Sequence, residues 1–160
     1  MIRSTLRPRS RRLLVAAVTG LLTLAPLGTA GAAAPSRSKL EVFEVNSTPV
    51  RAGERTELHT VIGNDGPEPT ANPITVDIEL PLGSYAAEPF FPTDCRPGMG
   101  GHSVSCQFPA GLRDGRTATV LIPVVVENGT PPGELTDGKV TVTSVDDPAV
   151  APWQFGITVI

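Results

Sequence analysis

The chain has 160 residues, of which 13 are basic, 16 are acidic and two are cysteines. Five of the basic residues and none of the acidic ones lie before residue 33, so the remainder of the chain carries a formal charge of −8. Binding to phosphate groups requires clustered Lys and Arg side chains. This balance therefore argues against nucleic acid and against anionic membrane surfaces as partners.

The N-terminus has the three parts of a secretory signal peptide: basic residues 3–12, an apolar run over 13–27 and small residues over 29–34. The apolar run of about 15 residues is shorter than the roughly 20 that a membrane-spanning helix needs. We expect cleavage after Ala32 and no transmembrane segment in the mature chain, with an uncleaved anchor as the alternative. Because Arg11 and Arg12 also fit a twin-arginine signal, both export routes remain open.

The sequence beyond the signal peptide predicts one domain. Residues 33–38 are polar and are expected to form a flexible lead-in, and residues 39–160 carry the regular patterns. About 128 residues suffice for one hydrophobic core and leave no room for a second. We therefore predict a signal peptide at 1–32, the lead-in and one folded domain.

The first half of this domain reads as strand, turn, strand, turn, strand. Strands are predicted at 39–46, 55–62 and 74–80. The third is the clearest, because Ile74, Val76, Ile78 and Leu80 alternate with Thr75, Asp77 and Glu79, which predicts one dry and one wet face. A turn at 64–67 precedes it, in which Gly66 is expected to adopt a positive φ.

The second half is less regular. Residues 84–94 are expected to form a short edge segment and a loop, and further strands are predicted at 103–108, 116–127, 138–145 and 155–160. Pro123 removes one ladder donor from the strand at 116–127, which implies either a free strand edge or a bulge at that point.

No window of the chain keeps the apolar stripe of a helix, and 16 Gly and 17 Pro interrupt it frequently. This pattern predicts an all-β sandwich of about seven strands in two sheets. An up-and-down barrel is less favoured, because the predicted strands differ in length and regularity.

Five short motifs follow one another in a distinctive order. They are Val50-Arg51-Ala52-Gly53-Glu54, Asn64-Asp65-Gly66-Pro67, Leu80-Pro81-Leu82-Gly83, the pair Cys95 and Cys106, and Leu112-Arg113-Asp114-Gly115. Their order resembles the conserved repeat domain of bacterial surface proteins, catalogued as domain of unknown function eleven, from about Val45 to the C-terminus.

The resemblance implies an immunoglobulin-like sandwich, extracellular or wall-associated, of a kind often repeated in tandem as a spacer or adhesive stalk. It carries over no catalytic residues. Here there is a single copy, without a Leu-Pro-x-Thr-Gly sorting signal, and the chain departs from the family in both respects.

Cys95 and Cys106 are the only cysteines, and both lie in the part expected to be exported. An even cysteine count outside the cell favours a disulfide, which would stabilise the fold by roughly 2 to 3 kcal/mol for a loop of this size. The alternative is a metal or redox pair, which the missing C-x-x-C spacing disfavours. The bridge is also expected to hold Phe90 and Phe91 against the end of the sandwich.

Two histidines are candidates for a catalytic base. His59 is predicted beside Glu57 on a wet strand face, and His102 lies in a Gly-rich loop near Ser103 and Ser105. The G-x-S-x-G motif of a nucleophile elbow is absent, so we expect solvated histidines and predict no catalytic residues.

Carboxylates could act in two ways. Asp77 and Glu79 are expected about 7 Å apart on one strand face, a spacing that glycosidases use, although alternation on a wet face often produces such pairs. Asp65, Asp137 and the pair at 146–147 lie in predicted loops and could gather calcium, but no EF-hand spacing supports this. We predict no metal and no cofactor.

Tyr85 and the single Trp, Trp153, could form a platform for a sugar if their rings were exposed. A lone Trp in a small sandwich more often packs in the core, and core packing is the expectation for Trp153.

Taken together, the sequence predicts a secreted, non-catalytic bacterial β-sandwich module, extracellular or loosely attached to the cell wall. Its predicted role is structural or in protein interaction at the cell surface, with a cell-envelope protein or polysaccharide as partner. The segment from Phe90 to His102, tied by the disulfide, is the predicted contact surface. The alternative is an extracellular module that binds carbohydrate or another small ligand.

Overall fold

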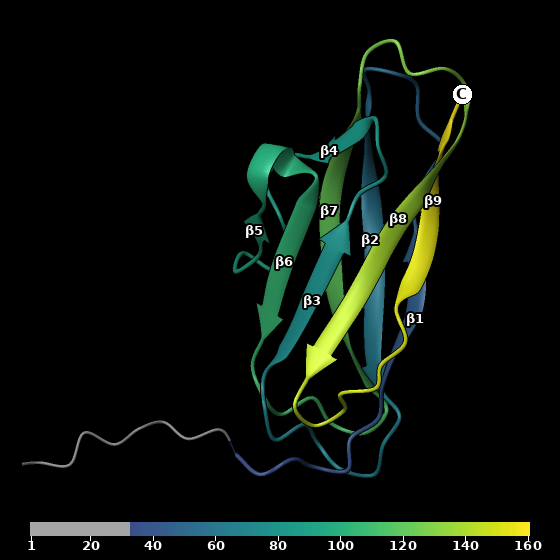
Figure 1. Ribbon diagram of the computed structural model, residues 1–160. Helices are drawn as coiled ribbons and strands as arrows, with labels where there is room; N and C mark the ends of the chain where they lie inside the picture. The colour runs from purple at the N-terminus through teal and green to yellow at the C-terminus, as the bar shows by residue number, and fades with distance from the viewer. Residues whose placement is uncertain (1–32) are drawn as a thin grey trace, which may run out of the picture. The chain divides into compact units, whose positions relative to one another are not determined.

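The computed structural model describes residues 33–160, so the predicted signal peptide lies outside the described residues (Figure 1). The elements are β1 (Leu40–Asn46), β2 (Arg55–Asn64), β3 (Ile74–Glu79), β4 (Ser84–Ala86), β5 (Arg96–Pro97), the 3-10 segment η1 (Met99–Gly101), β6 (Ser103–Phe108), β7 (Arg116–Val126), β8 (Gly133–Ser144) and β9 (Trp153–Val159). Within this part of the chain no helix is long and apolar enough to cross a membrane. The all-β class predicted from the sequence is confirmed.

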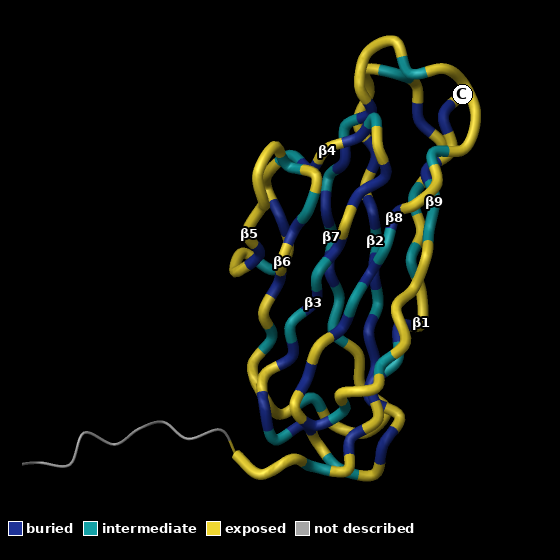
Figure 2. Tube along the Cα trace, viewed as in Figure 1, coloured by how far each residue is buried: buried dark blue, intermediate teal, exposed yellow. Residues whose placement is uncertain are grey.

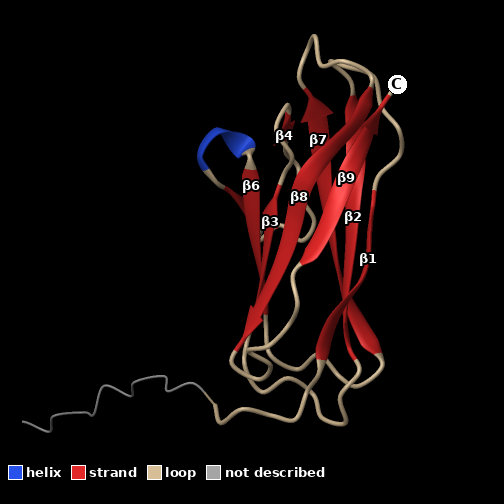
Figure 3. Cartoon of the chain, turned by 45° about the vertical axis from the view of Figure 1, so that its right-hand side comes forward, coloured by secondary structure: helices blue, strands red, loops and turns tan. Residues whose placement is uncertain are grey.

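The strands form two antiparallel sheets that face each other (Figures 1 and 3). One sheet has the order β1-β2-β7-β4 and the other β5-β6-β3-β8-β9. On one side of the sandwich β1 lies beside β9, and on the other side β4 lies beside β6. The edges of the two sheets therefore meet on two sides of the sandwich, and different strands form the edges on each side.

The core lies between the sheets and is built from alternate residues of each strand. Ile74, Val76 and Ile78 of β3 are fully buried while Thr75 and Asp77 keep partial exposure, as the alternating colours along the strands in Figure 2 show. Burying an aliphatic side chain of this size contributes about 1.5–3 kcal/mol each. One hydrophobic cluster connects both sheets, so the alternation predicted from the sequence specifies a single core.

Strand β7 shows how the fold accommodates Pro123. The register between β2 and β7 is continuous from Arg55 opposite Val125 to Asn64 opposite Arg116, so no bulge lies there. The odd-numbered residues of β7 direct their backbone groups away from β2: Leu121 exchanges two hydrogen bonds with Phe91, and the Pro123 carbonyl accepts one from Ala87. The bulge is therefore excluded, and the edge of β7 is not free at Pro123, because Ala87 bonds to the Pro123 carbonyl. The Pro123 nitrogen lies on the side away from β2, so its missing N–H costs no hydrogen bond to β2.

Residues 33–160 form nine strands. Strand β4, with three residues, lies in the predicted edge segment at 84–94, and β5, with two residues, was not predicted. Strand β8 begins at Gly133 and not at residue 138 as predicted. A bulge between Leu135 and Gly138, where Asp137 has a φ of 70°, breaks the alternation on which the prediction depended. The sequence pattern therefore predicted only the part of β8 that follows the bulge.

The turn after β2 differs from the prediction. Gly66 does not adopt a positive φ. The backbone of residues 37–39 passes so close that a Cβ on Gly66 would lie 2.6 Å from the Arg37 carbonyl oxygen, closer than real Cβ atoms come. Glycine is therefore required here by the close approach of two backbones and not by its left-handed conformation.

Asn64, at the end of β2, connects three segments through its buried side chain. Its Oδ1 accepts hydrogen bonds from the backbone N–H groups of Lys39 and Gly66, each at 3.0 Å. Its Nδ2 donates to the carbonyls of Glu68 at 2.8 Å and Leu112 at 2.9 Å. The start of β1, the turn after β2 and the loop before β7 are thereby held together by one amide.

Candidate interaction surface

The segment between β4 and β6, residues 87–102, is held to the sandwich at several points. Cys95 and Cys106 form the predicted disulfide, with both residues buried. The N–H of Phe91 donates to the Leu121 carbonyl at 3.0 Å, and the N–H of Leu80 donates to the His102 carbonyl at 2.9 Å. These bonds fix the backbone of the segment at its middle and at its end.

The two neighbouring phenylalanines of this segment have different environments. Phe90 is 8% exposed and belongs to the hydrophobic core, whereas Phe91 is 55% exposed. Met99, in η1, is 98% exposed. Phe90 therefore anchors the segment in the core. Phe91, before Cys95 in the chain, and Met99, after it, are exposed to solvent.

Removing the disulfide is expected to lower the free energy of unfolding by about 2–3 kcal/mol, because the open loop regains conformational freedom in the unfolded chain. The measurement is chemical denaturation of the Cys95→Ala, Cys106→Ala double variant beside the oxidised wild type. Reduced wild-type protein should show the same loss. A double variant as stable as the oxidised protein would contradict the expectation.

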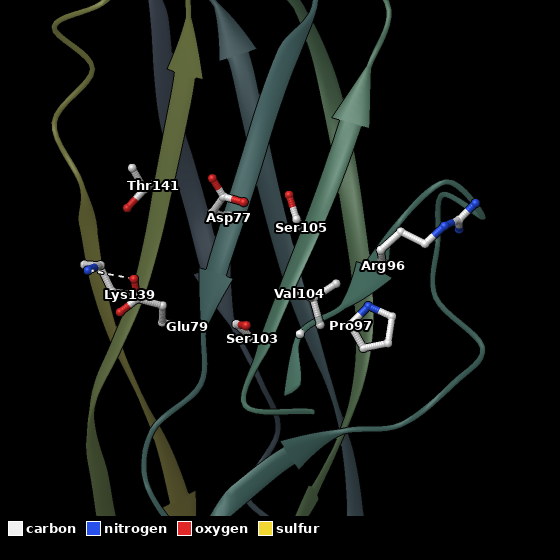
Figure 4. A pocket seen from close by; sticks show the side chains of 10 residues that line it. Asp77, Glu79, Arg96, Pro97, Ser103, Val104, Ser105, Lys139 and Thr141 are labelled. Atoms are coloured by element: carbon white, nitrogen blue, oxygen red, sulfur yellow. Dashed lines mark ion pairs between the residues drawn. The ribbon is translucent and has the colours of Figure 1, made fainter. Parts of the chain in front are cut away.

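The outer face of the five-stranded sheet carries a polar groove of about 780 Å³ (Figure 4). The structure brings Asp77 and Glu79 together on this face, as the sequence predicts. Glu79 forms an ion pair with Lys139 of β8 at 2.9 Å. The rest of the lining is Arg96, Pro97, Gly98, Val104 and the hydroxyl-bearing residues Ser103, Ser105 and Thr141. The groove offers hydrogen bonds to a polar ligand. Its Glu79 carboxylate is already neutralised by the Lys139 ammonium group.

The histidines are not brought into a catalytic arrangement with serine. His59 lies half-exposed in β2, in the other sheet from Ser103 and Ser105. The Nδ1 atom of His102 lies 3.0 Å from the carbonyl oxygen of Ser84, and no hydrogen bond joins a histidine to a serine hydroxyl in residues 33–160. The ring contacts the backbone of β4 at the end of η1.

The loop carboxylates considered for calcium serve the fold in other ways. Asp147 accepts a hydrogen bond from the Leu40 N–H at 2.9 Å, and Asp65 lies 3.9 Å from the Lys39 ammonium group. Asp137 lies in the bulge of β8, far along the strand from Asp146. Over residues 33–160 no group of three or more His, Cys, Asp or Glu side chains could hold a metal ion.

Asp146 is the most constrained of these carboxylates. It accepts hydrogen bonds from the backbone N–H of Ser36 at 2.7 Å, the backbone N–H of Asn72 at 2.8 Å and the Asn72 side-chain amide at 3.1 Å. Burial raises the pKa of Asp146. The hydrogen bonds from Ser36 and Asn72 lower it by more than burial raises it, so the pKa lies below its ordinary value.

A lowered pKa in the folded state means that ionised Asp146 stabilises the fold above the unfolded pKa, near 3.9, and that this contribution disappears as the pH falls through the folded pKa. We expect the stability difference between the wild type and Asp146→Asn to be largest near neutral pH and to shrink as the pH falls below the unfolded pKa and through the lower folded pKa. Urea denaturation across this range measures it. A constant difference would contradict the assignment.

The two aromatic candidates for a sugar platform lie on opposite sides of the sandwich. Tyr85 belongs to β4, at the edge beside β6, and Trp153 belongs to β9, at the edge beside β1. The structure therefore does not combine them. The expectation that Trp153 packs in the core is wrong, since 41% of the residue is exposed. Trp153 is the first residue of an edge strand and lines a groove of about 530 Å³, so the core does not enclose it.

These features define an immunoglobulin-like β-sandwich with a disulfide-tied segment at one edge. A chain of a type I cohesin–dockerin complex from Clostridium thermocellum is similar in structure, with a TM-score of 0.50, 9% identity, and coverage of 76% of this chain and 94% of that one. The major pilin subunit of Bacillus cereus follows with a TM-score of 0.49, 13% identity, and coverage of 77% and 40%.

The chitin-binding domain of a chitinase from Pyrococcus furiosus has 22% identity and a TM-score of 0.37, over 66% of this chain and 92% of that one. At these identities the likeness shows the fold alone. No protein-family model matches the chain, and no curated protein sequence is similar to it.

Proposed function

We propose that this chain is a secreted, non-catalytic module with a structural or protein-interaction role at the bacterial cell surface. The observation that carries the proposal is the presentation of Phe91 and Met99 on a backbone held by the disulfide and by the hydrogen bonds to β7. A preordered apolar surface binds a protein without the cost of ordering a loop. Aromatic residues and Met, the types of these two side chains, are enriched in protein–protein interfaces.

The disulfide supports an address outside the cytosol, because such bonds persist in oxidising compartments. Together with the predicted signal peptide it supports a secreted protein, extracellular or loosely attached to the wall. Membership of the repeat domain of unknown function eleven is part of the same proposal. The partner would be a component of the cell envelope.

The test is capture of partners from an envelope extract of the producing cell by the immobilised protein. We expect the Phe91→Ala, Met99→Ala double variant to retain at most about a tenth of the captured partner, because truncating two apolar contact residues should cost about 1.4 kcal/mol or more. Leu82→Ala is the matched control, since Leu82 is 85% exposed but lies outside the segment. Full retention by the double variant would remove this segment as the contact surface.

A second candidate function is binding of a carbohydrate or another small ligand, and the exposure of Trp153 favours it. The groove beneath Trp153 is lined by Leu40, Val42 and Val150 together with the polar side chains of Lys39 and Asp147. An apolar floor with a few polar groups suits a sugar ring. Quenching of the single Trp fluorescence by wall polysaccharide would support this function, and an unchanged spectrum across polymers would count against it.

A further inference from the structure

Strand β7 has a free edge over its first half. Residues 117 and 119 have the same parity as Leu121 and Pro123, so their backbone N–H and C=O groups point away from β2. Leu121 and Pro123 find partners in Phe91 and Ala87, whereas β4 pairs only with Val124–Val126. Within residues 33–160 no backbone group pairs with Thr117 or Thr119 on this side.

An apolar groove of about 360 Å³ lies against this free edge. Its lining joins both sheets, since Ile74 and Phe108 belong to β3 and β6 while Ala118 belongs to β7. Phe91 and Leu112 supply further apolar surface. The groove is therefore an opening into the space between the two sheets, bordered by unpaired backbone groups.

On the opposite side of the sandwich, which carries the groove beneath Trp153, backbone hydrogen bonds bridge the edge near the C-terminal end of β9. There the N–H of Val50 donates to the Thr158 carbonyl at 3.0 Å, and the Val50 carbonyl accepts from Ile160 at 2.9 Å. A single residue thus joins the turn after β1 to the edge of β9. Natural sandwiches protect their edges in this way, so an edge left open beside an apolar groove is a candidate for strand addition.

Three arginines neighbour the lining of the groove although the chain is acidic. Arg113 follows Leu112, Arg116 precedes Thr117, and Arg96 lies beside Phe108 and Pro109. Among the described residues none of these three arginines has a carboxylate within 4.0 Å. Asp94 and Asp114 lie among them in the chain, which leaves the rim with an excess of one positive charge.

We propose that an extended peptide segment of a partner protein adds as a strand to β7 at Thr117–Thr119. Its backbone pairs with the two free residues, its alternate apolar side chains enter the groove, and acidic residues at its ends meet the arginines. A second copy would bring its whole charge of −8 to this acidic chain, whereas a peptide segment places its carboxylates only beside the arginines, so the peptide is the favoured occupant. This inference rests on the proposed interaction role and names its partner.

The first test uses the purified protein and a synthetic capped peptide, Asp-Glu-Val-Thr-Val-Thr-Val-Glu-Asp. We expect the amide hydrogens of Thr117 and Thr119 to exchange at least about tenfold more slowly in its presence, measured by NMR. A copy N-methylated at alternate residues, which keeps the side chains but loses the ladder donors, should bind at least about tenfold more weakly. Equal affinity of the two peptides, or unchanged exchange at both threonines, would overturn the proposal.

The second test uses the chain itself. Thr119→Pro removes an edge donor and should weaken peptide binding at least about tenfold, whereas Gln154→Pro, on the outer edge of β9, is the control and should leave it unchanged. If Thr119→Pro fails to fold, the comparison of the two peptides on the wild type still decides. A concentration-dependent dimer that Thr119→Pro abolishes would show a second copy as the occupant and refute the proposal.

The two proposals can fail separately. Envelope capture that is lost with Phe91→Ala and Met99→Ala but kept with Thr119→Pro would leave the interaction role standing and refute strand addition. Loss of capture in both the Phe91→Ala, Met99→Ala double variant and Thr119→Pro, with capture kept in Gln154→Pro and Leu82→Ala, is the result that supports both.

Discussion

Replacing Asn64 with alanine is expected to lower the free energy of unfolding by about 3–4 kcal/mol, a large share of the stability of a domain of this size. The side chain is 1% exposed and makes four hydrogen bonds to backbone groups of three segments. Its removal leaves the backbone N–H groups of Lys39 and Gly66 and the Glu68 carbonyl without the amide in a place that water reaches poorly, while the Leu112 carbonyl keeps the bond from the Thr70 N–H. Urea denaturation followed by circular dichroism measures the loss.

Asn46→Ala is the matched control, because Asn46 is exposed at the end of β1 and bonds only to the exposed side chain of Glu44. Its effect should stay within about 0.5 kcal/mol. Asn64→Asp should also be destabilised, since a carboxylate keeps the acceptor but loses the amide donor to Glu68 and Leu112. An Asn64→Ala variant as stable as Asn46→Ala would show that the three segments are held by other contacts.

Phe90→Ala is expected to cost about 3–4 kcal/mol, whereas Phe91→Ala should change stability by no more than about 0.5 kcal/mol. The physical reason is burial: Phe90 leaves a cavity in the core when truncated, and the Phe91 ring already faces water. Thermal and urea denaturation of the two single variants measure the contrast.

This pair also decides how binding data are interpreted. Loss of capture in a Phe90→Ala variant would report unfolding of the segment, and loss in Phe91→Ala would report a lost contact. Equal destabilisation by both substitutions would contradict the separation of the two rings. For this reason the capture experiment pairs Phe91 with Met99 and leaves Phe90 intact.

Much of the candidate surface was predictable, and its fine structure was not. The even cysteine count identified the pair Cys95 and Cys106, and the Pro-rich stretch identified a loop between strands. Which of two adjacent phenylalanines faces the core depends on how β7 receives the segment at Leu121, and that contact joins residues far apart in the chain. No local pattern encodes it.

In a regular strand the sequence alone determined which side chains are buried, because successive side chains point to opposite faces and the apolar ones face the core. This is why β3 and β7 match their predictions closely. The sequence likewise determined the all-β class and the disulfide. Strand order, the buried amide of Asn64, the close approach at Gly66 and the exposure of Trp153 were decided only by the tertiary structure. Each of these depends on which distant segment becomes a neighbour, and the hydrogen bonds and space that result exist only after the two sheets have come together.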